Sequence, residues 1–80
     1  MITLEEAMGM FQKMIDEHPE KYTIFEAWEI PYEDPVHGED PLYIMTVLNE
    51  NGEQFFPGEV FKSIRKRDGE LVNFEFPVPG

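Results

Sequence analysis

The most distinctive local feature of the sequence is a repeated Glu-Asp-Pro triplet, at residues 33–35 and 39–41, around Val36-His37-Gly38. Four carboxylates and one imidazole are a ligand set that hard or borderline cations accept. The spacing, however, matches neither the alternating oxygen ligands of an EF-hand loop nor a His-Glu-x-x-His helix. We therefore expect a solvated acidic loop that its prolines stiffen, and we predict no metal ligands and no cofactor. A metal-dependent activity at residues 33–40 ranks third among the functions considered.

Other residue patterns that support catalysis are missing from the sequence. Serine occurs once, at Ser63, without the glycines of a nucleophile elbow, and there is no cysteine. Asp16-Glu17-His18 has an acid–base composition but no nucleophile beside it. No phosphate-binding or dinucleotide-binding glycine pattern occurs. The sequence therefore predicts a non-enzymatic protein with no catalytic residues.

The charge of the chain is strongly negative, with 17 acidic and 6 basic residues and a formal net charge of −11. Four of the six bases lie within residues 62–67, so the sequence describes an acidic body with one short basic patch. A field of this sign repels phosphate backbones and anionic membrane surfaces and attracts basic proteins. We predict no direct binding to nucleic acid and no membrane binding.

The first functional hypothesis follows from this charge. We expect an inhibitor or adaptor that presents carboxylates to a basic protein partner, since matched fields speed association and select partners. In bulk composition alone, inhibitors that imitate nucleic acid and immunity proteins that block basic nucleases look similar. The expected contacts lie on the 33–40 loop, with two further residues on the preceding strand if its face is exposed. These residues are Glu33, Asp34, Glu39 and Asp40, then Glu26 and Glu29.

The second hypothesis is a structural or assembly subunit. Met10 and Met14 lie at the edge of a wide apolar arc on the first predicted helix, and methionines suit adaptable interfaces. This interpretation predicts a homodimer or a docking surface whose association survives high salt, because apolar burial is not screened as exposed charges are.

The elements that must position these residues begin with a helix predicted over residues 4–17. Thr3 and Glu6 fit a capping box, and an apolar stripe follows at helical spacing. Pro19 ends the pattern, because the residue before a proline avoids the helical region. The stripe consists of Leu4, Met8, Phe11 and Ile15, widened by Ala7 and Met14.

Two strands are predicted next, over residues 21–32 and 42–48, joined by about nine residues of loop as an antiparallel hairpin. In the first strand Ile24 and Trp28 fall on one alternating set, and Phe25 and Ala27 on the other. The second strand is apolar on both faces, as a central strand is. Asn51-Gly52 then predicts a turn into a short returning strand at residues 54–56.

Residues 60–66 fit two structures. A helix is favoured because Glu59 lies in its first turn and bases lie in its last, both favourable to the helix dipole. The rival is a hairpin that turns at Asp68-Gly69. Residues 70–76 then alternate as a strand, and residues 77–80 form an irregular tail.

The predicted fold is therefore α+β, in the order α-β-β-(β)-α-β, with an N-terminal helix and a short second helix on a three- to four-stranded antiparallel sheet. The alternative, if residues 60–66 are strand, is a small SH3-like barrel with an N-terminal helix. We expect residues 1–80 to form one compact domain. With no signal peptide, no apolar run of membrane-spanning length and no cysteine, we expect a soluble, cytoplasmic protein.

Overall fold

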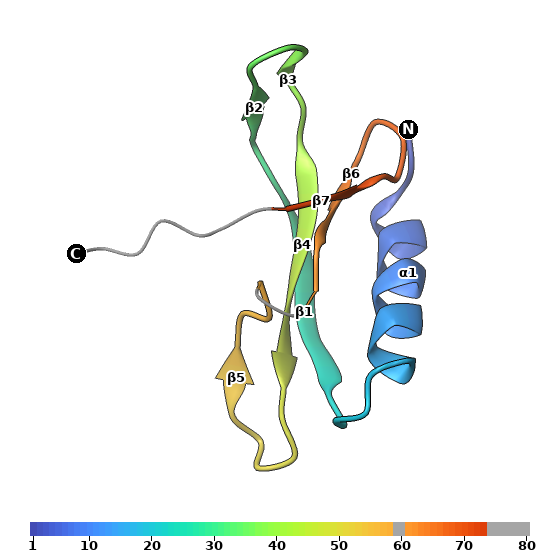
Figure 1. Cartoon of the computed structure of the whole chain (residues 1–80), viewed down its shortest axis with the longest axis vertical. Coiled ribbons are helices and arrows are strands. Elements are labelled where there is room, and N and C mark those ends of the chain that lie inside the picture. Colours follow the sequence, from blue (N-terminus) through green and yellow to red (C-terminus); the bar gives the residue numbers. More distant parts are fainter. Residues whose placement is uncertain (59–60, 74–80) are drawn as a thin grey trace, which may run out of the picture.

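The structure is a computed structural model that describes residues 1–58 and 61–73 (Figure 1). One helix packs on a mostly antiparallel sheet, so the predicted α+β class is confirmed. The elements in chain order are α1 (Leu4–Asp16), β1 (Thr23–Ile30), β2 (Glu33–Asp34), β3 (Gly38–Glu39), β4 (Leu42–Leu48), β5 (Gln54–Phe55), β6 (Ser63–Arg65) and β7 (Leu71–Val72).

Helix α1 begins as its sequence predicts. The Thr3 side chain accepts a hydrogen bond from the Glu6 amide, and the Glu6 carboxylate accepts one from the Thr3 amide, which completes the capping box. The residues that α1 buries are Ala7, Phe11 and Ile15. Met8, predicted within the apolar stripe, is 38% exposed, and the helix buries the neighbouring Ala7 in its place.

Strands β1 and β4 form the predicted antiparallel hairpin. Their register shifts between Ile24 and Glu26, so Phe25 is an extra residue in β1 and forms a β-bulge. One inserted residue moves every later side chain of the strand to the opposite face. The faces expected from simple alternation are therefore wrong after Phe25. Ile24 and Ala27, assigned to opposite faces, both pack against the core.

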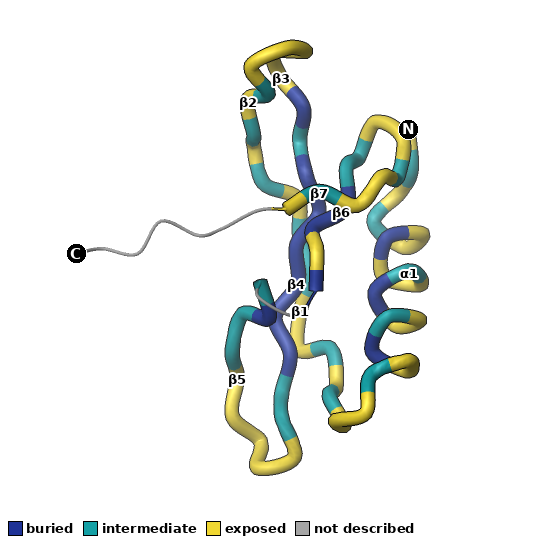
Figure 2. The backbone as a smooth tube through the Cα atoms, viewed as in Figure 1, coloured by how far each residue is buried: buried dark blue, intermediate teal, exposed yellow. Residues whose placement is uncertain are grey.

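Strand β4 runs through the middle of the sheet and is buried from Leu42 to Val47 (Figure 2). It pairs with β1 on one side and with β5 and β6 on the other. Burial on both faces of β4 confirms the prediction of a central strand. The core between α1 and the sheet is made by Ala7, Phe11, Ile15, Tyr43, Met45, Val47, Phe61 and Ile64.

The helix predicted over residues 60–66 is wrong for the described residues of that segment. Ser63–Arg65 form strand β6, which pairs with β4 and then returns as β7, as the rival hairpin prediction requires. Ile64 is fully buried against the core, and the Ser63 hydroxyl donates to the carbonyl of Val72 at 2.7 Å. Gly69, with φ of 76°, serves the hairpin turn. Pairing with a neighbouring strand therefore outweighs the local charge pattern that favoured a helix.

Strands β1 and β7 lie at opposite ends of the order β1-β4-β6-β7, so the described strands do not close into the alternative barrel. The predicted turn at Asn51-Gly52 is confirmed, with φ of 77° at Gly52, and it leads into β5. The tail predicted at residues 77–80 lies outside the described residues. Within the described part, no helix has the length and apolar character needed to cross a bilayer.

Candidate functional site

The repeated Glu-Asp-Pro segment forms a short hairpin instead of the predicted open loop. Strands β2 and β3 make a two-stranded ribbon that prolongs the β1–β4 hairpin past the end of the sheet (Figure 1). Glu33 lies directly opposite Glu39, and both are exposed. Because opposite residues of an antiparallel pair share one face, these two carboxylates lie on the same side of the ribbon.

The carboxylate of Asp34 accepts hydrogen bonds from the turn that follows it. Its Oδ1 accepts hydrogen bonds from the amides of Val36 and His37, at 2.7 and 3.1 Å. These two bonds, together with the nearby His37 ring at 3.4 Å, hold the pKa of Asp34 below its usual value despite partial desolvation. The side chain therefore closes the hairpin turn, as an aspartate in an Asx turn does.

Asp40 is buried, with 1% of its surface exposed, so it is not available to a partner and we remove it from the predicted contact residues. Its Oδ2 lies 2.9 Å from Nε of Arg65 and 3.8 Å from a terminal nitrogen of Arg67. The contact with Arg65 is an ion pair without hydrogen-bond alignment, and no described residue donates a hydrogen bond to either carboxylate oxygen. The charge of Asp40 is thus compensated by two cations.

Arg65 joins the end of the acidic ribbon to the β6–β7 turn. Besides Asp40, its guanidinium contacts Asp68 at 3.2 Å and Glu70 at 3.1 Å. Partial desolvation would lower the pKa of Arg65, but the hydrogen bond to Asp68 and the three carboxylate charges raise it overall. The Lys66 amide also donates to the Pro41 carbonyl at 3.0 Å, which fixes the start of β4 beside β6.

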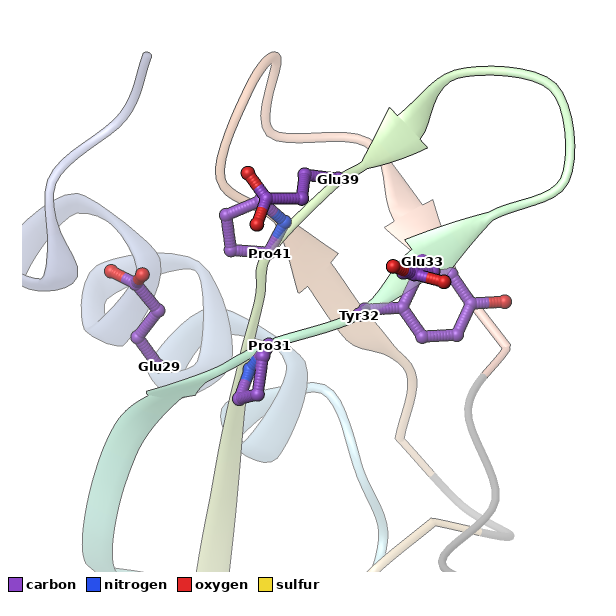
Figure 3. A pocket seen from close by; sticks show the side chains of 6 residues that line it. All are labelled: Glu29, Pro31, Tyr32, Glu33, Glu39 and Pro41. Atoms are coloured by element: carbon purple, nitrogen blue, oxygen red, sulfur yellow. The ribbon is translucent and has the colours of Figure 1, made fainter.

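A cavity of about 460 Å³ opens where the β1–β4 hairpin passes into the β2–β3 ribbon (Figure 3). Carboxylate, phenol and proline side chains share its lining, which therefore offers negative charge beside apolar walls. Such a lining suits a cation with an apolar stem, because carboxylates attract the charge and proline rings pack against the stem. The lining residues are Glu29, Pro31, Tyr32, Glu33, Glu39 and Pro41.

Glu29 and Glu26, the two contacts predicted on the preceding strand, are both exposed on β1. Glu29 lies in the cavity lining, but Nζ of Lys66 donates to it at 2.7 Å. This hydrogen bond raises the pKa of Lys66 above its usual value. Glu26 lies opposite Thr46 and has no cationic partner among the described residues. Of the six predicted contacts, Glu26, Glu33 and Glu39 are therefore those with no cationic partner among the described residues.

Met10 and Met14, the predicted alternative interface, are partly buried and pack against the core between α1 and the sheet. Their side chains therefore belong in part to the interior, and an interface at Met10 and Met14 stays a prediction. The large apolar side chains that the structure leaves exposed include Met8 on α1, Phe25 at 52% and Leu71 at 49%.

The residues that sequence reasoning missed are the cavity walls Pro31, Tyr32 and Pro41, and the supporting Arg65. Proline and tyrosine at a strand end carry no local signal of a cavity. Arg65 is one of the bases in the last turn of the helix predicted over residues 60–66, and that prediction gave no reason to pair it with Asp40. Prediction of the β4–β6 pairing would have placed Arg65 near Asp40, because Arg65 lies opposite Leu42, two residues after Asp40.

Among residues 1–58 and 61–73, no group of three or more His, Asp or Glu side chains is arranged to hold a metal ion. Fold and site together define a class: an α+β domain that exposes an acidic hairpin. Comparison with family models, curated proteins and solved structures finds no match for this chain.

Proposed function

We propose that the chain is a non-enzymatic protein-binding domain, an inhibitor or adaptor, that presents the β2–β3 ribbon to a basic partner. The observation that carries the proposal is the exposed pair Glu33 and Glu39, which lie directly opposite one another and form no ion pair with any described residue. Like charges placed directly opposite on a ribbon repel each other, and a cationic group from a partner relieves that repulsion.

The cavity beside this pair supports the same function. Glu33 and Glu39 line it together with Tyr32, and Glu29 adds a third carboxylate that Lys66 compensates. A lysine or arginine side chain of the partner would pack its stem on the prolines and bring its charge to the two free glutamates. The net charge of −11 adds a long-range attraction that speeds encounter with a basic protein. A cytoplasmic location belongs to this proposal, and the absence of cysteine favours it.

The test compares the two hairpin turns at opposite ends of the molecule (Figure 1). Each variant reverses two exposed glutamates, Glu33→Lys with Glu39→Lys at the β2–β3 ribbon, or Glu50→Lys with Glu53→Lys at the β4–β5 turn. The two variants have the same net charge, so any difference between them is local. Immobilised wild type and both variants are incubated with an extract of the cells that make the protein and washed at low and high salt.

The expected result is a basic protein that wild type and the β4–β5 variant retain at low salt and release at high salt. The ribbon variant should lose it, with circular dichroism confirming that the variant is folded. Equal retention by both variants would show that net charge alone attracts the partner, and it would contradict a site on the ribbon.

A further inference from the structure

The outer side of β1 is the longest edge of the sheet among the described strands. β1 has eight residues and pairs only with β4, whereas β7, at the other end of the order, has two. An edge strand presents unpaired amides and carbonyls to which another extended chain can add. The bulge at Phe25 interrupts this edge, so its regular part is Glu26–Ile30.

The hydrogen-bond pattern shows which backbone groups face outward. The amide of Lys66 donates to the Pro41 carbonyl, and the amide of Asn49 donates to the carbonyl of Glu53, so odd-numbered residues of β4 bond toward β5 and β6. Because backbone groups alternate along a strand, even-numbered residues of β4 bond toward β1.

Applied to β1, the same alternation identifies its outward groups. Leu42, Ile44 and Thr46 lie opposite Ile30, Trp28 and Glu26. By this alternation, these three pairs are the ones that exchange hydrogen bonds between β1 and β4. The residues between them, Ala27 and Glu29, therefore direct their amides and carbonyls to the outer edge. No described strand pairs with this edge.

We propose that an extended, basic segment of the partner adds to β1 as a further strand and bonds to the backbone of Ala27 and Glu29. This inference rests on the proposed function, because the basic character of the partner comes from it. Charge complementarity selects this occupant: the exposed Glu26 lies on the same edge, and Glu33 continues beyond it on the ribbon. A second copy of the chain is a poorer occupant, because it would place its own Glu26 and Glu29 against these residues and would add its net charge of −11.

The test uses a short synthetic peptide of alternating lysine and valine as the probe. In Ala27→Pro the outward amide is removed and the proline ring stands in the path of an added strand. We expect the fold to tolerate this change, because proline is accepted where the amide of an edge strand faces solvent. Ala27→Ser keeps the amide and nearly the same size, and it is the matched control.

Titration should show that Ala27→Pro weakens peptide binding by about tenfold or more, while Ala27→Ser binds as wild type does. Amide hydrogen exchange on wild type gives a measurement that does not depend on how the variant folds. Bound peptide should slow exchange at Ala27 and Glu29 and leave Trp28, already bonded to β4, unchanged.

Three results would overturn the edge proposal, and they separate it from the proposed function. If the peptide binds wild type and Ala27→Pro equally without protecting Ala27 and Glu29, the edge is not used. Loss of binding in Glu33→Lys with Glu39→Lys would then leave the acidic ribbon as the site. If wild type does not bind the peptide, the edge takes no basic strand, and the extract experiment decides the ribbon separately. If Ala27→Pro abolishes self-association of the free protein, the occupant is a second copy.

Discussion

Glu33-Asp34-Pro35 and Glu39-Asp40-Pro41 contain the same three side chains, yet their aspartates lie in different surroundings. The Asp34 side chain is 20% exposed and accepts hydrogen bonds from two amides of its own turn. The Asp40 side chain is 1% exposed and forms an ion pair with Arg65. The glutamates are alike, since each faces the other across the ribbon.

The difference arises from the neighbouring strands. Asp40 leads through Pro41 into β4, and β6 lies alongside that point and brings Arg65 to the carboxylate. Asp34 lies at the far end of the ribbon, where β2 pairs with no described strand other than β3. The comparison teaches that a carboxylate-rich triplet does not define its role by itself: tertiary pairing decides whether a carboxylate supports the fold or remains free for a partner.

The largest effect on stability should come from Asp40→Asn. The change keeps the size of the side chain but removes the negative charge that pairs with Arg65. Asp68 and Glu70 still contact that guanidinium, which limits the loss of stability. We expect the free energy of unfolding to fall by about 2 kcal/mol, which lowers Tm by roughly 8–16 °C in a domain of this size. Urea and thermal unfolding monitored by circular dichroism measure the change. Asp34→Asn, which should alter the midpoint far less at neutral pH, is the matched control, and equal losses in both variants would remove the distinction between the two triplets.

A smaller effect is expected from the charge of Asp34, and it depends on pH. Hydrogen bonds from Val36 and His37 hold the pKa of Asp34 in the folded protein below its ordinary value of 3.8. The folded state therefore binds this proton less readily than the unfolded state does. The resulting stabilisation is present above the ordinary pKa and is lost as the pH falls through the folded pKa.

Asp34→Asn isolates this contribution, because asparagine keeps an oxygen for both amides but cannot ionise. The Tm of wild type should exceed that of the variant by a few degrees at neutral pH, and the gap should close as the solution is acidified below the ordinary pKa. Asp68, whose pKa is also lowered, chiefly by the amide of Glu70, is present in both proteins and cancels in the difference. A gap that stays constant with pH would mean that the charge of Asp34 does not stabilise the fold.

The sequence predicted those parts of the fold whose signals are local. The capping box of Thr3 and Glu6, the apolar run of β4 and the Asn51-Gly52 turn each specify one structure within a few residues. The segment around Ser63–Arg65 had conflicting local signals, and its pairing with β4 decided the outcome. The bulge at Phe25 was not predicted: the polar Glu26 breaks the apolar alternation, but one such break does not identify an inserted residue.

The candidate site was predicted only in part, because some of its features have local sequence signals and others depend on long-range pairing. The concentration of carboxylates at residues 33–40 is visible in the sequence, but the β2–β3 hairpin that they form was predicted only as a loop. The burial of Asp40 is not, because its partner Arg65 lies in a strand whose position depends on long-range pairing. Which carboxylates remain free could therefore be decided only from the structure.

The smallest stability effect should come from the glutamate pair, and it should have the opposite sign. Glu33→Gln removes the repulsion between Glu33 and Glu39, so we expect a gain of about 0.2–0.5 kcal/mol in the free energy of unfolding, shrinking as salt is added. Glu26→Gln is the control, since Glu26 is exposed on a strand but lies opposite the neutral Thr46, and it should give no comparable gain. Urea unfolding at low and high salt measures both variants, and equal gains would show a general effect of net charge. Glu33→Gln should thus stabilise the free domain and also weaken its binding to a basic partner. That result would mean that repulsion between Glu33 and Glu39 destabilises the free domain and that the bound partner relieves it.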